Sequence, residues 1–141
     1  MKEYVLDANA VLRYFSVGDG RGGEKVRGLF EQAERDQARL SMSTINLGEV
    51  LYVLLKYVGE ERALEYVKAL RHAVTMVDAD TSRAIAAARL KHRYKLGYAD
   101  SFAAALAIEL KATLVSSDPA FEKVGKDLKW LRLPKFEAKK R

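Results

Sequence analysis

Short apolar runs alternate along this chain with longer segments in which apolar residues recur every three or four positions. The short runs predict buried strands, and the longer spacing predicts amphipathic helices. We therefore expect strands at 4–6, 39–43, 74–77, 113–116 and 129–133, and helices at 9–15, 24–36, 45–57, 60–73, 81–95, 98–111 and from Pro119 onward. Strands that alternate with helices predict an α/β fold, a three-layer sandwich in which helices cover both faces of a mostly parallel sheet.

Two of the predicted helices differ in how deeply we expect them to be buried. The helix at 98–111 is apolar almost all round, which predicts burial on most of its sides. The helix at 81–95 is amphipathic, and its inner side is predicted to carry Ile85, Ala88, and Leu90 or His92.

The chain has no internal repeat and no composition shift that marks a domain boundary. We predict one domain at residues 1–134, followed by a basic tail at 135–141. The glycine-dense stretch at 18–23 predicts a flexible loop.

Composition narrows the chemistry that this chain can perform. Apolar residues make up 49% and charged residues 31% of its 141 positions, which is typical of a folded globular protein. The absence of cysteine excludes disulfides and thiolate metal sites, and two histidines disfavour a histidine-rich zinc site. A metal would be held by oxygen, which favours Mg²⁺ or Mn²⁺. No secretory signal or membrane span is recognisable, so we expect a cytoplasmic protein.

Positive charge is concentrated in two segments. The last ten residues account for +4 of the net charge of +6, so the rest of the chain is close to neutral. The second segment leads directly into the region of Asp100. We predict that its four basic residues bind phosphate groups, and the alternative is a solvated helix face. These residues are Arg89, Lys91, Arg93 and Lys95.

Four acidic residues lie beside apolar runs: Asp7, Glu49, Asp100 and Asp118. An unpaired carboxylate is costly in such surroundings unless a positive charge neutralises it. Asp7 and Asp118 each follow a predicted strand, and ligands bind at the carboxyl ends of strands in open α/β sheets. We therefore predict that the four acids share a site for divalent cations.

Each acid also has a structural interpretation. Asp7, Asp100 and Asp118 can each act as a helix N-cap, and Pro119 makes this most persuasive for Asp118. Glu49 lies within a helix and cannot cap it. Its alternative is a narrow solvent-facing polar stripe. That stripe would consist of Glu49, Asn46 and Tyr52.

Four segments together resemble the acidic motifs of PIN-domain ribonucleases. They are YVLDANAVL at 4–12, STINLGEV at 43–50, YADSF at 98–102 and LVSSDPAF at 114–121. They occur in order over essentially the whole chain. The length is that of the VapC-type toxins of prokaryotic toxin–antitoxin pairs, which this sequence resembles.

The resemblance implies a function and a set of site residues. Asp7, Glu49, Asp100 and Asp118 match the family's catalytic metal-binding acids, and Asn9 and Ser116 match its auxiliary polar positions. It further implies a five-stranded parallel sheet and endonucleolytic cleavage of RNA that depends on Mg²⁺ or Mn²⁺. With RNA as substrate, we predict that the four basic residues near Asp100 assist its binding through phosphate contacts. A homodimer and inhibition by a cognate antitoxin are also expected.

Three other classes of protein remain as alternatives. A phosphatase with an aspartyl nucleophile needs a second Asp where this chain has Asn9. A receiver-like phospho-acceptor domain can use Asp78 and Lys135, but leaves Glu49 and Asp100 without a role. A non-catalytic RNA- or protein-binding module would use the basic segments alone, and its binding would be indifferent to metal.

Overall fold

A computed structural model describes residues 1–15 and 22–135. Its five strands form one parallel sheet in the order β3-β2-β1-β4-β5. The strands are β1 (Lys2–Leu6), β2 (Ala38–Ser43), β3 (Thr75–Val77), β4 (Thr113–Ser116) and β5 (Lys129–Arg132). The helices are α1 (Ala8–Tyr14), α2 (Gly23–Glu34), α3 (Thr44–Val58), α4 (Glu60–Ala73), α5 (Thr81–Tyr94), α6 (Tyr98–Leu110) and the 3₁₀ segment η1 (Pro119–Asp127).

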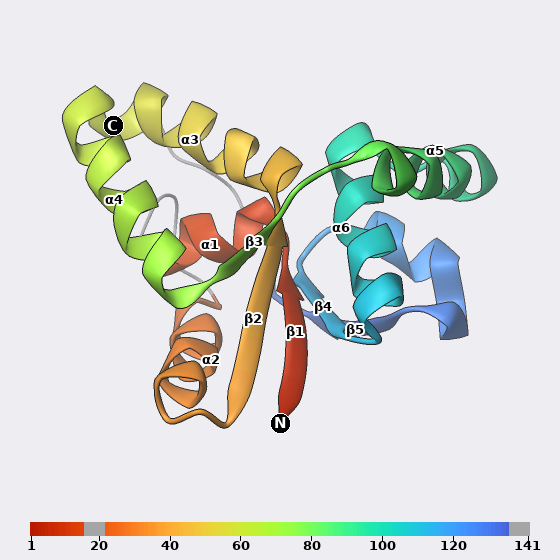
Figure 1. Cartoon of the computed structure of the whole chain (residues 1–141), viewed down its shortest axis with the longest axis horizontal. Coiled ribbons are helices and arrows are strands. Elements are labelled where there is room, and N and C mark those ends of the chain that lie inside the picture. Colours follow the sequence, from red (N-terminus) through yellow and green to blue (C-terminus); the bar gives the residue numbers. More distant parts are fainter. Residues whose placement is uncertain (16–21, 136–141) are drawn as a thin grey trace.

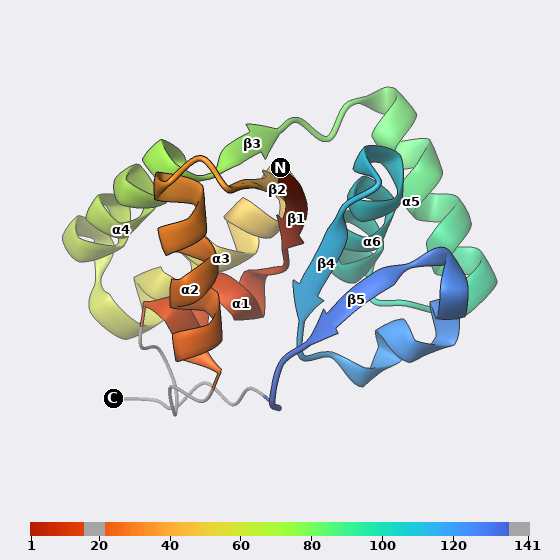
Figure 2. The ribbon, with the colours of Figure 1, turned by 90° about the horizontal axis from the view of Figure 1, so that it is seen from below.

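Helices cover both faces of this sheet, as Figures 1 and 2 show. Helices α1 to α4 pack on one face, around a core that includes Leu6 and Val115 from the central strands. Helix α6 and η1 pack on the other face, around Val5 and Leu114. Because successive strand residues point to opposite faces, each central strand contributes to both cores. The predicted three-layer α/β sandwich with a five-stranded parallel sheet is confirmed.

Helix α6 is buried on most sides, as its composition predicts. The side chains of Phe102, Ala103 and Ala107 are each at most 4% exposed. Its alanine-rich surface lets β1, β2, α3 and α5 pack against a single helix. The first turn of α6 is therefore held rigidly above the sheet.

The predicted inner side of α5 is wrong in most positions. Ile85 is 50% exposed, and Ala88 and His92 are exposed as well. Ala87 is buried instead, and of the predicted residues only Leu90 packs in part against the core. Helix α5 packs on α6, where the small side chain of Ala87 permits close approach.

Two predicted features lie wholly or largely beyond the described residues. These are the glycine-rich loop at 18–23, except its last two positions, and the basic tail after Lys135. Within the described part of the chain, no helix combines the length and the apolar character that spanning a bilayer requires.

Candidate active site

The four predicted acids come from four different elements. Asp7 follows β1, Asp118 follows β4, Glu49 lies in α3, and Asp100 lies in the first turn of α6. The structure brings them close enough for their charges to interact. Asp7 is affected by Glu49 and Asp118, and Asp100 is affected by all three of the others. The fold thus gathers them at the carboxyl ends of the two central strands.

Asp7 lies at the centre of this group and is 2% exposed. The Ser116 hydroxyl donates a hydrogen bond of 2.7 Å to its Oδ2, and Asn9 Nδ2 donates to the same atom at 3.1 Å. The backbone N–H of Ala8 donates to Oδ1 at 2.8 Å, so Asp7 is the N-cap of α1. Asn46 Nδ2 donates to Oδ1 at 3.4 Å. These donors fix the orientation of both carboxylate oxygens.

Burial raises the pKa of Asp7 to about 6, and the negative charges of Glu49 and Asp118 add to this effect. The hydrogen bond from Ser116 and the N–H of Ala8 act in the opposite direction, because both favour the charged form. These hydrogen bonds do not cancel the rise in pKa, so Asp7 is less ionised near neutral pH than an ordinary aspartate. A nearby cation would complete its ionisation.

Asp100 is the most strongly perturbed of the four. Burial raises its pKa to about 8, and the charge of Asp7 and a hydrogen bond with Asp118 contribute further. Gly97, not Asp100, is the N-cap of α6, so the capping interpretation of Asp100 is wrong. A Cβ atom at Gly97 would lie 3.1 Å from Oδ2 of Asp100. Glycine therefore leaves this carboxyl group the space that it occupies.

Asp118 does act as a cap. Its Oδ1 accepts a hydrogen bond of 2.9 Å from the N–H of Ala120 at the start of η1. Its own N–H donates to Oγ of Ser116 at 3.2 Å, and Ser116 in turn donates to Asp7. Capping and membership of the acidic group are therefore compatible for Asp118, as they are for Asp7.

Asn46 connects two of the acids and was not predicted to be part of the site. It is fully buried, and its Nδ2 donates to Oε1 of Glu49 at 3.1 Å and to the carbonyl of Ala99 at 3.2 Å, as well as to Asp7. A solvent-facing stripe that includes Asn46 is therefore wrong, although Tyr52 is 64% exposed. The only signal in the sequence was its position three residues before Glu49, on the same side of the helix.

Glu49 differs from the other three acids because its side chain is exposed to solvent. Partial desolvation still raises its pKa, and the hydrogen bond from Asn46 opposes that shift. Glu49 therefore forms the rim of the acidic group, whereas Asp7 forms its floor.

The donor chemistry of these residues fits a divalent cation. Within residues 1–15 and 22–135, no three His, Asp or Glu side chains are already arranged as a finished set of metal ligands. However, the raised pKa values of Asp7 and Asp100 arise partly from mutual repulsion of carboxylates, which a cation would relieve. Carboxylate oxygens are the ligands that Mg²⁺ and Mn²⁺ prefer.

The two predicted auxiliary residues lie beside Asp7. Asn9 Nδ2 donates to Oγ of Ser116 at 3.0 Å as well as to Asp7, and Asn9 Oδ1 accepts from the N–H of Ser117 at 3.2 Å. Asn9 and Ser116 thereby tie the start of α1 to the end of β4. Both therefore position Asp7.

The four basic residues predicted to bind RNA are all exposed, in the last two turns of α5 or just beyond its end. Two of them have partners within the fold. Lys91 Nζ donates to the carbonyl of Leu96 at 2.8 Å, and the guanidinium of Arg93 lies 5.2 Å from the ring centroid of Tyr94. Their role in binding RNA stays a prediction.

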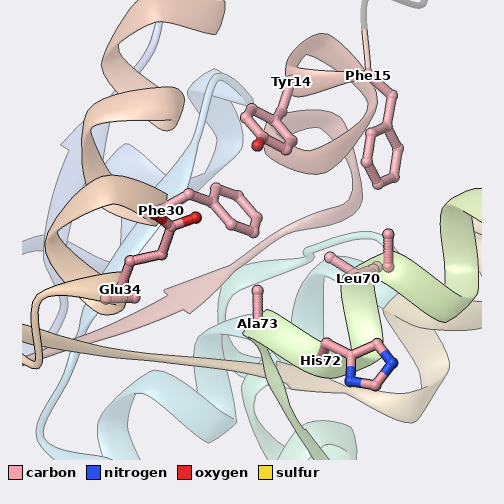
Figure 3. Close-up of a pocket in the computed structure, with 9 residues that line it drawn as sticks. Tyr14, Phe15, Phe30, Glu34, Leu70, His72 and Ala73 are labelled. Atoms are coloured by element: carbon pink, nitrogen blue, oxygen red, sulfur yellow. The ribbon is translucent and has the colours of Figure 1, made fainter.

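A separate pocket of about 420 Å³ lies between α1, α2 and α4 (Figure 3). Tyr14 and Phe30 stack on one another there with ring centroids 4.2 Å apart. None of the four acids lines this pocket, and among its described lining residues the acidic or basic side chains are Glu34 and His72. The largely aromatic and aliphatic lining makes it distinct from the acidic group.

Fold and site together define a parallel α/β protein with a cluster of acids at the ends of its central strands. A family model described as the PIN domain matches residues 4–127. The chain therefore belongs to the PIN domain family. No curated protein sequence matches the chain significantly.

Several solved structures share the fold. DNA-bound VapBC from Salmonella typhimurium has a TM-score of 0.75 and 22% identity, covering 94% of this chain and 98% of that one. VapBC2 from Rickettsia felis, bound to a promoter DNA fragment, has a TM-score of 0.74 and 18% identity, covering 93% of this chain and 98% of that one. VapC20 from Mycobacterium tuberculosis, a toxin described as cleaving the sarcin-ricin loop, has a TM-score of 0.66 and 15% identity. The match covers 86% of this chain and 95% of that one. At these identities the likeness supports the fold.

Proposed function

We propose that this protein is a divalent-metal-dependent endoribonuclease and the toxin of a toxin–antitoxin pair. The observation that carries the proposal is a convergence of four acids at the carboxyl ends of the central strands, where the pKa of Asp100 is raised to about 8. The four acids are Asp7, Glu49, Asp100 and Asp118. Titratable groups perturbed in this way are typical of functional sites. Membership of the PIN domain family supports the same conclusion.

In this proposal the four acids hold Mg²⁺ or Mn²⁺ through their carboxylate oxygens. Such a cation, when bound, polarises a phosphoryl oxygen and promotes attack by water on phosphorus. Asp7 is kept in one orientation by Ser116 and Asn9. Asn46 keeps Glu49 at a fixed distance from Asp7. The protein thus prepares its ligands before substrate arrives.

The receiver-like alternative loses support from the order of the strands. Receiver domains place their third strand next to the first, in the order 2-1-3-4-5. Here β3 lies at the sheet edge, beyond β2. Asp78, which follows β3, is exposed and is not among the groups that perturb Asp7 or Asp100. It is therefore poorly placed to serve as a phospho-acceptor within the acidic group.

The phosphatase and binding-module alternatives are also less well supported. Asn9 hydrogen-bonds Asp7 at the position where a phosphatase needs its acid. A binding module that used only its basic segments would leave the burial of Asp7 among other carboxylates without a function. Buried, mutually repelling acids lower stability unless a ligand compensates.

The partners follow from the proposed function. Two of the solved structures named above are of VapBC, and the third is a toxin described as cleaving the sarcin-ricin loop. We infer that this chain acts on RNA in the cytoplasm, pairs with a cognate antitoxin and forms a homodimer. Light scattering of the purified chain tests whether it forms a homodimer. Induction in a bacterial host should arrest growth, and co-expression of a small neighbouring reading frame should restore it.

The decisive test of the enzyme is cleavage of a mixed RNA pool that includes structured cellular RNAs. The full chain is assayed with Mn²⁺, with Mg²⁺ and with EDTA, beside Asp7→Asn. The matched control is Glu31→Gln, which removes one negative charge from an exposed position of α2. Cleavage that requires metal, survives in Glu31→Gln and disappears in Asp7→Asn supports the proposal. Binding without cleavage under every metal condition would favour the binding module.

A further inference from the structure

Arg132 lies on the strand next to Ser116, the hydrogen-bond partner of Asp7, at a position that none of the family motifs includes. It pairs in register with Ser116 across β4 and β5. Val5, Leu114 and Trp130 are register neighbours that share the α6-side core. Asp7, Ser116 and Arg132 each come two residues after one of these three. Because strand side chains two residues apart point to the same face, Asp7, Ser116 and Arg132 lie in a row across that face of the sheet.

The guanidinium of Arg132 is held by its neighbours. Its Cζ lies 5.1 Å from the ring centroid of Trp130, a cation–π contact. The indole is itself fixed, because its Nε1 donates to the carbonyl of Ser116 at 3.1 Å and its ring meets Phe121 edge-on. Among the described residues, no carboxylate pairs with Arg132. Its charge is therefore oriented and available to an anion.

A pocket of about 460 Å³ opens between Arg132 and the turn that carries Asp118. Pro119, Leu133 and Pro134 give it apolar walls, and Arg132 supplies positive charge. Lys135 also lines it, and no acid does so among the described residues. Ser117 completes the lining, and the Asn9 side chain accepts a hydrogen bond from its N–H. Volume and lining suit one nucleotide, which needs apolar contact for its base and a cation for its phosphate.

We propose that Arg132 and this pocket bind the nucleotide adjacent to the cleaved phosphodiester, with the guanidinium on its phosphate. The inference rests on the proposed nuclease function. The acids repel an RNA backbone, so the strand needs a cation beside them in order to stay bound. Arg132 supplies it one strand away from Ser116, whereas Lys91 on α5 already bonds a backbone carbonyl.

The test measures binding of a labelled single-stranded RNA of mixed sequence by fluorescence anisotropy, across a range of salt and in EDTA. The full-length parent chain is compared with Arg132→Gln, with Arg132→Lys and with Lys129→Gln. Lys129 is exposed at the opposite end of β5, so its change matches the loss of charge at a distance from the acids. Thermal unfolding checks that each variant folds.

Arg132→Gln is expected to weaken binding roughly tenfold. It should also reduce the slope of log affinity against log salt concentration by about 0.7, the contribution of one phosphate contact on a single strand. Arg132→Lys should keep the slope, and Lys129→Gln should match the parent. In the cleavage assay, Arg132→Gln should raise KM and leave kcat within about twofold.

Two outcomes would overturn the subsite. One is parent-like affinity and slope in Arg132→Gln, and the other is an equal loss in Lys129→Gln. If the parent still cuts RNA in either case, the nuclease proposal stands and only the subsite is wrong. If the parent neither binds nor cuts RNA, both proposals fail.

Discussion

The hydroxyl of Ser116 donates a hydrogen bond of 2.7 Å to Oδ2 of Asp7, and so joins the end of β4 to the end of β1. The two residues are 109 positions apart in the sequence. This bond opposes the rise in the pKa of Asp7 that burial causes. Ser116 thus favours the charged form of the acid at the floor of the site.

Replacing Ser116 with alanine should weaken the site without unfolding the chain. Loss of the donor raises the pKa of Asp7 further, so a cation must displace a more tightly bound proton. We expect Mn²⁺ affinity to fall by about 10–100-fold, the usual effect of removing a supporting partner. The loss should be larger at pH 6 than at pH 8. Calorimetric titration at both values measures it, with the exposed Ser82→Ala as control.

Asn46→Ala should lower both stability and activity. The change removes the donor to Asp7, Glu49 and the carbonyl of Ala99. Leaving buried acceptors unsatisfied costs about 1–3 kcal/mol of the free energy of unfolding. Urea unfolding measures this, with the exposed Tyr52→Ala on the same helix as control. An unchanged unfolding midpoint for Asn46→Ala would show that these bonds contribute nothing.

Stability of the metal-free chain should fall as pH rises. Burial and repulsion raise the pKa of Asp7 to about 6 and that of Asp100 to about 8 in the folded state. The folded chain therefore holds protons that the unfolded chain releases near pH 4. Each raised pKa stabilises the fold at low pH, and that stabilisation is lost between about pH 4 and pH 8. Melting temperatures in EDTA across this range test the sign.

Mn²⁺ should raise the melting temperature, and more at pH 8 than at pH 5, because protons compete with the cation for the same oxygens. In EDTA, Asp100→Asn should melt at or above the parent temperature at pH 8, since it removes one repelling charge. The same variant should lose most of the Mn²⁺-induced rise. A rise in Asp100→Asn equal to that of the parent would remove Asp100 from the site.

Local sequence predicted most of the elements to within one or two residues. The helix Glu60–Ala73 and the strand Thr113–Ser116 have the bounds expected. Gly59, with a φ of 82°, ends one helix before the next begins, and glycine adopts this conformation readily. The side of α5 that would be buried was not predictable, because it depends on how closely α6 approaches Ala87.

The site, like the fold, was predictable from local sequence only in part. Each acid could be found because it stood out against an apolar run. Asn46 could not, since a polar residue in a helix usually indicates a solvent-facing stripe. Its partners Asp7 and Ala99 lie 39 and 53 residues away, and only the folded chain brings them together.

We propose that the four acids form one metal-dependent nuclease site. Cleavage of the RNA pool by the parent, Asp100→Asn and Glu31→Gln, in Mn²⁺ and in EDTA, tests it most directly. We expect cutting by the parent and by Glu31→Gln in Mn²⁺ but not in EDTA, and a loss of more than about a hundredfold in a folded Asp100→Asn. Cutting by Asp100→Asn at the parent rate, or cutting that persists in EDTA, would contradict it.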